Sequence, residues 1–203
     1  MPPARNPSPP SQPRRRADAE RSVARILDAA VEALASDPEA SMAEIARRAG
    51  VVRATIYVHF PTRESLIDAV TERAIFEVTR VIEAAEPQRG EAADALARVV
   101  TAAWRALGRF HALVALNTRL PQDELHRRHQ PLLAMLEPLI SRGQRDGTFR
   151  TEVSSTWHLS MLLALVHAAS AQLRAGRMPA DAIEAAVVAT VLGAVAAPPT
   201  EPS

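Results

Sequence analysis

One segment, from Ser41 to Phe60, constrains the fold more than any other part of this chain. Its sequence, SMAEIARRAGVVRATIYVHF, predicts a short helix, a glycine turn and a second short helix. Gly50 ends the first helix, because glycine adopts the left-handed backbone conformation at little cost. Pro61 ends the second helix, because proline cannot continue one. The pattern is that of a helix-turn-helix, a motif whose second helix enters the major groove of duplex DNA.

The start of the first short helix carries a further signal. Ser41 and Glu44 fit the S-x-x-E capping box, in which the serine oxygen accepts a backbone N–H and the glutamate returns to the cap residue. Thr62 is placed to cap the helix that follows Pro61. Apolar residues recur at helical spacing and predict the buried faces, which are Met42, Ile45, Ala46 and Ala49 on the first helix and Ile56, Tyr57 and Phe60 on the second.

The run from Gly50 to Leu66, GVVRATIYVHFPTRESL, resembles the signature of the TetR family of transcriptional regulators. In that family a sequence similar to G-V-S-x-G-T-x-Y-x-H-F-x-S-K-E-x-L marks the recognition helix and the start of helix four. The resemblance covers about residues 20–70. It implies an all-α protein of about nine helices, in which helices one to three bind DNA. The other helices then form a ligand-binding and dimerisation domain.

Three positions depart from the family pattern. Val52 replaces a small polar residue, Ala54 replaces glycine or serine, and Val58 occupies an often polar groove position. Apolar side chains contact a thymine methyl group but cannot hydrogen-bond a base edge. We therefore expect base readout to shift toward thymine methyls, toward Arg53, or toward DNA shape.

The second short helix and its flanks supply the expected DNA contacts. Arg53 is the expected base reader, because its guanidinium can pair with guanine O6 and N7. The resemblance implies phosphate contacts from Thr55, Tyr57 and His59, and from Arg63 in place of the family's lysine. Ser41 is expected to add another while capping its helix. The complete expected DNA site is Ser41, Val52, Arg53, Ala54, Thr55, Tyr57, His59 and Arg63.

Proline and glycine divide the chain, which shows no strand-like alternation. We expect a disordered, basic, proline-rich arm at 1–16, a helix-turn-helix domain at 17–62, a helical regulatory domain at 63–197 and a tail at 198–203. The arm's arginines either stay in solvent or touch DNA. Helices are predicted near 18–36, 42–49, 53–59, 63–85, 91–107, 110–118, 122–146, 155–175 and 179–196, with Pro131 dividing or starting the seventh.

Composition narrows the chemistry. The chain of 203 residues has no cysteine, which excludes disulfides, thiolate catalysis and cysteine-based zinc sites. All 24 cationic residues are arginine, which excludes lysine chemistry. The net charge is only +1, but positive charge gathers in residues 1–16 and 41–64, where DNA would lie. No apolar run reaches the roughly 20 residues of a membrane span, so a cytoplasmic protein without membrane contact is predicted.

The last two predicted helices suit a homodimer interface. Their apolar residues repeat every three or four positions, and the resemblance implies a four-helix bundle with the partner. An internal core would satisfy the same pattern. The predicted interface residues are Leu159, Leu162, Val166, Leu173, Ile183, Val187, Val191 and Val195.

The effector pocket is expected among helices four to eight. Low aromatic content favours an aliphatic pocket for a small apolar effector, with His111 and Asn117 as polar anchors. The predicted liners are Trp104, Phe110, His111, Asn117, Met135, Trp157 and Met161. No cofactor is predicted.

Taken together, the sequence predicts a ligand-responsive repressor that binds a pseudo-palindromic operator on double-stranded DNA as a dimer. A helical ligand-binding or protein-docking module with weak or lost specific DNA binding is the alternative. A metal sensor through His126 and His129 lacks a fixed third ligand, and an enzyme lacks a nucleotide loop or a convincing triad.

Overall fold

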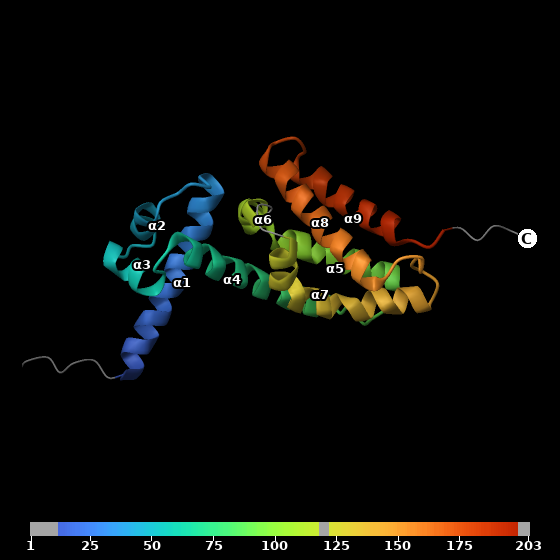
Figure 1. The fold of residues 1–203 in the computed structure, drawn as a ribbon, viewed down its shortest axis with the longest axis horizontal. Helices are drawn as coiled ribbons and strands as arrows, with labels where there is room; N and C mark the ends of the chain where they lie inside the picture. Colours follow the sequence, from blue (N-terminus) through green and yellow to red (C-terminus); the bar gives the residue numbers. More distant parts are fainter. Residues whose placement is uncertain (1–11, 118–121, 199–203) are drawn as a thin grey trace, which may run out of the picture. The chain divides into compact units, whose positions relative to one another are not determined.

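The computed structural model describes residues 12–117 and 122–198, which are almost entirely helical. Within these ranges, Phe149 and Ala196 form an isolated antiparallel β-bridge. The chain divides into two compact units, Met1–Ile67 and Asp68–Ser203. The all-α fold class expected from the sequence is confirmed, and the helices follow one another in the predicted order (Figure 1).

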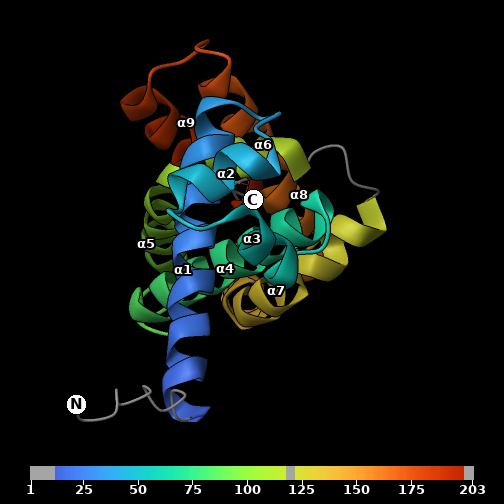
Figure 2. The same cartoon turned by 90° about the vertical axis from the view of Figure 1, so that its left-hand side faces the viewer.

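The first unit holds helix α1 (Gln12–Ser36), the two short helices α2 (Met42–Arg48) and α3 (Arg53–His59), and the start of α4 (Arg63–Ala84). α2 packs against both α1 and α3, and Figure 2 shows the two short helices beside the longer one. The core of this unit is formed by fully buried side chains: Ile26, Leu34, Ile45, Ile56 and Leu66.

Helix α1 begins earlier than expected. Residues 12–16 were assigned to a disordered arm, but α1 starts at Gln12 and includes them. Pro13 lies in the first turn, where a missing N–H costs no intrahelical hydrogen bond. Residues 1–11, which make up the rest of the expected arm, lie outside the described residues, as does most of the expected tail at 198–203.

The turn of the helix-turn-helix follows the sequence signals closely. Gly50 has a positive φ of 64°, the conformation that favours glycine. The Ser41 hydroxyl accepts the Glu44 N–H at 3.2 Å, as predicted for an N-cap. The reciprocal half of that capping box differs, because the Glu44 carboxylate pairs with Arg47 and Arg48.

A complete reciprocal cap forms at the next helix. The Ser65 N–H donates to the Thr62 hydroxyl at 3.1 Å, and the Thr62 N–H donates to the Ser65 hydroxyl at 3.2 Å. Both residues therefore satisfy backbone donors at the start of α4. This start sets the position of Arg63, the first residue of the helix.

The second unit contains the rest of α4 and the helices that follow it. These are α5 (Ala92–Ala106), a 3-10 turn (Gly108–Phe110), α6 (His111–Asn117), α7 (Gln122–Arg145), α8 (Ser155–Arg174) and α9 (Ala180–Val195). α5 packs against α7 and α9, while α8 packs against α6, α7 and α9. An ion pair of 2.7 Å between Arg105 and Glu184 also joins α5 to α9.

Helix α7 is continuous, although Pro131 was expected to divide or start it. Pro131 and Pro138 both lie inside the helix and are exposed, so the carbonyls left unpaired by proline can face water. At the other end of α7, Gly143 lies against the ring of Phe149, and a Cβ there would come closer than 3 Å to that ring. Phe149 is 1% exposed and fixes the turn after α7.

Candidate nucleic-acid interface and cavity

One face of α3 points into solvent. Val52 and Val58 are 70% and 77% exposed, and Tyr57 is 38% exposed. On the opposite face Ile56 is fully buried and fixes the helix to the first unit. Arg53 and Ala54 are exposed as well. The structure therefore brings together four of the eight predicted DNA-contact residues, Val52, Arg53, Ala54 and Tyr57, on one exposed surface.

Arg53 and Tyr57 are coupled within this surface. The Arg53 guanidinium carbon lies 5.6 Å from the centre of the Tyr57 ring, one helical turn away. A guanidinium over an aromatic face is attracted by the ring's quadrupole. The contact limits the rotamers of Arg53 while leaving its N–H groups free to reach a base edge.

The other predicted contacts are less exposed. Thr55 and His59 are half-buried, and the His59 ring lies 6.4 Å from the ring of Phe60. The hydroxyl of Ser41 is exposed but already accepts the N–H that it caps. A phosphate contact from Ser41 would therefore use its own O–H as donor.

Arg63 has a role that the sequence did not indicate. Its guanidinium donates hydrogen bonds to the backbone carbonyls of Pro38 and Ala40, in the loop between α1 and α2. Arg63 is half-buried there. In this conformation it holds the loop that precedes α2, so its expected phosphate contact would have to share the same guanidinium.

Glu44 gathers two further cations on α2. Its carboxylate accepts from Arg47 at 2.7 Å and from Arg48 at 2.9 Å, and these contacts lower the pKa of Glu44 to about 2. The same pairing raises the pKa of Arg47. Two positive charges of the helix-turn-helix are thus partly neutralised wherever Glu44 is ionised.

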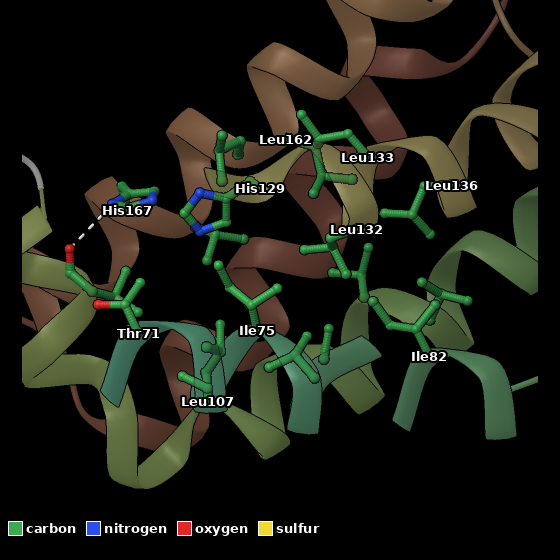
Figure 3. Close-up of a pocket in the computed structure, with 18 of the residues that line it drawn as sticks. Thr71, Ile75, Ile82, Leu107, His129, Leu132, Leu133, Leu136, Leu162 and His167 are labelled. Atoms are coloured by element: carbon green, nitrogen blue, oxygen red, sulfur yellow. Dashed lines mark hydrogen bonds between the residues drawn. The ribbon is translucent and has the colours of Figure 1, made fainter. Parts of the chain in front are cut away.

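A cavity of about 70 Å³ lies inside the second unit (Figure 3). Helices α4, α5, α6, α7 and α8 contribute its lining, which is aliphatic apart from Thr71, His129 and His167. Figure 3 shows these three polar residues at one end, with Leu136 and Ile82 at the other. The cavity therefore has a long apolar part and a short polar end.

Both cavity histidines are held by backbone carbonyls. Nδ1 of His129 lies 2.8 Å from the Leu125 carbonyl, and Nδ1 of His167 lies 3.1 Å from the Val114 carbonyl. The two rings meet edge to face with their centres 5.6 Å apart. Since a carbonyl only accepts, Nδ1 carries the proton in each ring and Nε2 carries a lone pair.

Burial keeps these imidazoles neutral. It lowers the pKa of His167 to about 4 and also lowers the pKa of His129. His111 behaves in the same way, because burial lowers its pKa to about 4 while its Nδ1 lies 3.1 Å from the Ser170 hydroxyl. The His111 ring also lies against Trp104, with the ring centres 4.4 Å apart and the planes tilted by 41°.

The predicted effector residues lie elsewhere. Trp104, Phe110 and His111 are buried but do not line the cavity, and Trp157 is 63% exposed. Met135 and Met161 pack against the core, and the side chain of Asn117 lies outside the described residues. None of the six described side chains is among those lining the cavity. The prediction favoured large aromatic side chains as pocket lining. The observed lining consists mainly of shorter aliphatic side chains, which leave space between the helices.

The cavity's polar end was missed by the sequence reasoning. From the sequence, His129 was considered only as a metal-ligand candidate with His126, and no prediction was made for His167. The available signal was the position itself, because a histidine inside an aliphatic helical stripe must be satisfied by a nearby polar group. His126, its proposed metal partner, is exposed.

An outer groove of about 590 Å³ runs between α4 and α7 of the second unit. Thr71 and Ile75 line both this groove and the cavity. Arg128 crosses between the helices, pairing with Asp68 of α4 at 2.7 Å and with Glu124 of its own helix at 2.7 Å. A change in the distance between α4 and α7 must therefore strain or break the pair with Asp68.

The predicted dimer residues mostly face inward. Ile183, Val187, Val191 and Val195 of α9 are each at most 2% exposed in the single chain, and Leu159 is 4% exposed. Leu162 and Val166 line the cavity, and Leu173 packs against the core. The stripe therefore forms the chain's own core, which was the alternative that the pattern also allowed. Exposed residues of α8 and α9 are mostly small, and include Ala164, Ala168, Ala182, Ala185, Ala189 and Gly193.

Within residues 12–117 and 122–198 no helix has the length and apolar character needed to cross a membrane.

Comparison with known proteins places this arrangement among regulators. Residues 26–70 match the family described as bacterial regulatory proteins, tetR family. The chain is 28% identical to the HTH-type transcriptional repressor LfrR of Mycolicibacterium smegmatis over 186 residues, which cover 89% of this chain and 94% of LfrR. It is 27% identical to the HTH-type transcriptional regulator NfxB of Pseudomonas aeruginosa over 158 residues, covering 75% of this chain and 83% of NfxB.

A solved structure gives the same result. The TetR-like transcriptional regulator LfrR from Mycobacterium smegmatis, in complex with proflavine, superposes with a TM-score of 0.69. The sequences are 26% identical, and the superposition covers 87% of this chain and 97% of that chain.

Proposed function

The chain belongs to the TetR family of transcriptional regulators and is a DNA-binding regulator of transcription; from this premise we propose that it is a repressor released from a pseudo-palindromic operator by a small effector. The observation that carries the proposal is the exposed face of α3, on which Arg53 stands between Val52 and the tyrosine that supports it. The alternative of a module without specific DNA binding is not favoured.

Roles on this face follow from chemistry. Arg53 reads guanine, because a guanidinium pairs bidentately with guanine O6 and N7. Val52, Ala54 and Val58 contact thymine methyl groups, since they offer no hydrogen-bonding atom beyond the backbone. Tyr57, Thr55 and His59 contact phosphates, which gives affinity without choice of sequence. Ser41 and Arg63 support the fold of the motif and reach the phosphates beside it.

A dimer is needed for this readout. One short recognition helix contacts only a few base pairs, so two copies on half-sites roughly 34–36 Å apart supply specificity. The outer faces of α8 and α9 are the proposed interface, because their exposed alanines and glycine let the helices of two copies approach closely. The inward stripe of α9 then supports this interface from behind.

The effector is proposed to bind in the cavity of the second unit. Support comes from the cavity's apolar lining and from the relative LfrR, whose structure was solved with proflavine. Helix α4 carries Arg63 at its first residue and cavity residues from Thr71 onward, so it is the proposed transmitter. The effector shifts the equilibrium only if it binds one state more tightly than the other.

The test is selection of bound duplexes from random and genomic DNA by the purified chain, at two salt concentrations, for the wild type and for Arg53→Ala. We expect one pseudo-palindrome bound by a dimer, with preference lost at one base position in each half-site for Arg53→Ala. Tyr57→Phe is the matched control, and it should weaken all sequences alike.

Two results would count against the proposal. Salt-sensitive binding with no sequence preference would remove sequence-specific regulation. An equal loss for Arg53→Ala on selected and random DNA would remove Arg53 as a base reader and leave shape readout by the apolar positions.

A further inference from the structure

We propose that the effector is a neutral molecule with an apolar body and one hydrogen-bond donor, such as a phenol, an alcohol or an amide N–H, which donates to Nε2 of either His129 or His167. The inference rests on the proposed effector role of the cavity and narrows it to a chemical class.

The orientation of the two rings fixes which atom each can offer. The carbonyls of Leu125 and Val114 take the Nδ1 protons, so Nε2 of each neutral ring can only accept. Among the described residues neither Nε2 atom has a hydrogen-bond partner. Both histidines line a cavity whose walls are otherwise almost entirely aliphatic, so a donor that enters it can gain a hydrogen bond in a low-dielectric space.

The lining disfavours ions of both signs. The described residues around the cavity include no arginine, aspartate or glutamate. A carboxylate would need a protonated histidine, but burial lowers the pKa of His167 to about 4. An ammonium group would find acceptors but no negative charge, and burying an unpaired charge is costly.

The cavity is smaller than the space that a single-ring ligand needs. Its volume of about 70 Å³ is below the roughly 150 Å³ of a cavity that holds benzene. A small single-ring donor therefore binds only if the helices around the cavity move apart. Any such movement of α4 relative to α7 acts on the pair between Arg128 and Asp68.

Four probes of similar shape separate these chemistries: 4-ethylphenol, 4-ethyltoluene, 4-ethylbenzoate and 4-ethylbenzylamine. Calorimetric titration into the free full-length protein at pH 7.5 gives the dissociation constant of each. We expect 4-ethylphenol to bind at least about 10-fold more tightly than the other three, because only it is neutral and donates.

Variants locate the effect. In the double variant His129→Phe, His167→Phe the ratio between 4-ethyltoluene and 4-ethylphenol dissociation constants should fall to about one. His126→Phe, at an exposed histidine of the same helix that does not line the cavity, is the matched control and should keep the ratio. A ratio within one variant is insensitive to a general loss of stability.

The inference is overturned if 4-ethyltoluene or either ion binds as tightly as 4-ethylphenol, if the double variant keeps the preference, or if no probe binds up to its solubility limit. Because these titrations contain no DNA, failure of DNA binding does not affect them. Release of operator DNA by 4-ethylphenol is measured separately. Binding without release would leave the ligand chemistry standing and would remove the effector from the proposed function.

Discussion

On α3 the proposed DNA-contact side chains point away from the protein, whereas the side chains of the proposed effector site point into the cavity. Val52 and Val58 are more than two-thirds exposed and contribute little to the core of the first unit. Leu133 and Leu136 are at most 4% exposed and serve as cavity lining and core at once. Substitutions on α3 should therefore change DNA binding with little effect on stability, and cavity substitutions should change both.

The two regions also handle charge differently. In the first unit the charged pairs lie near the surface, with Arg21 on Asp18 and with Arg47 and Arg48 on Glu44, while Arg63 donates to backbone carbonyls. The second unit buries His111, His129 and His167 in neutral form. DNA binding by the first unit should therefore depend on the salt concentration, and the stability of the second unit should depend on pH.

The largest effect should come from truncating the cavity lining. Leu136→Ala is expected to lower the free energy of unfolding by about 2–5 kcal/mol, because it removes buried methyl groups and enlarges a void. Val58→Ala, the exposed counterpart, should stay within about 0.5 kcal/mol of the wild type. Urea unfolding followed by circular dichroism measures both. Similar losses for the two variants would contradict the contrast between the regions.

Acid should weaken the protein through its buried histidines. The pKa of His111 and of His167 is about 4 when folded, against 6.5 as the ordinary value. Between these values the unfolded chain binds protons that the folded chain does not, so stability is full above pH 6.5 and falls as the pH drops toward 4. For the two together the loss approaches about 3 kcal/mol at pH 5.5.

Thermal unfolding at pH 7.5 and pH 5.5 checks this dependence. His111→Phe should reduce the fall in melting temperature, whereas His126→Gln, at an exposed histidine, should leave it unchanged. A melting temperature equal at both pH values would show that these histidines are protonated in the folded state.

Arg63→Ala should have a mixed effect. Losing the bonds to the Pro38 and Ala40 carbonyls is expected to cost about 1 kcal/mol, less than a fully buried charged hydrogen bond. Because the loop before α2 loosens, DNA binding should weaken on all sequences alike. Arg25→Ala, at an exposed arginine of α1, is the control for charge. Weaker DNA binding with an unchanged unfolding midpoint would instead indicate a direct phosphate contact.

The smallest effect has the opposite sign. Glu44→Gln removes the carboxylate that pairs with Arg47 and Arg48, so both guanidinium groups become available to phosphates. We expect DNA affinity to rise a few-fold on specific and random duplexes, with a steeper salt dependence. Fluorescence anisotropy at several salt concentrations measures it. If Glu32→Gln, the same charge change on α1, has an equal effect, net charge alone is responsible.

Local signals explain why the first unit was predictable. Gly50, the Ser41 cap and Pro61 each act on their immediate neighbours, and all three behave as the sequence indicated. The two contacts that were not predicted there depend on which partner a charged side chain takes. Glu44 pairs with arginines one turn away and does not complete the capping box. Arg63 donates to carbonyls more than 20 positions earlier in the chain.

The cavity was not predictable for a related reason. Its existence depends on which aliphatic side chains from five helices fail to fill a space, and no single helix pattern records that. The stripe of α9 shows the same limit, because periodicity identified Ile183 and Val191 as a buried face without saying which partner buries them. Local sequence defines a face, and packing decides its neighbour.

For the proposed effector, the small volume of the cavity sets a threshold for the response. If the form wide enough for an effector is a minor population, the apparent dissociation constant exceeds the intrinsic one by the inverse of that population. Low concentrations of the effector then leave the operator occupied, and the midpoint of the dose–response curve is set by the protein's resting equilibrium as well as by its contacts. Substitutions that widen the cavity without touching the ligand should shift that midpoint to lower doses.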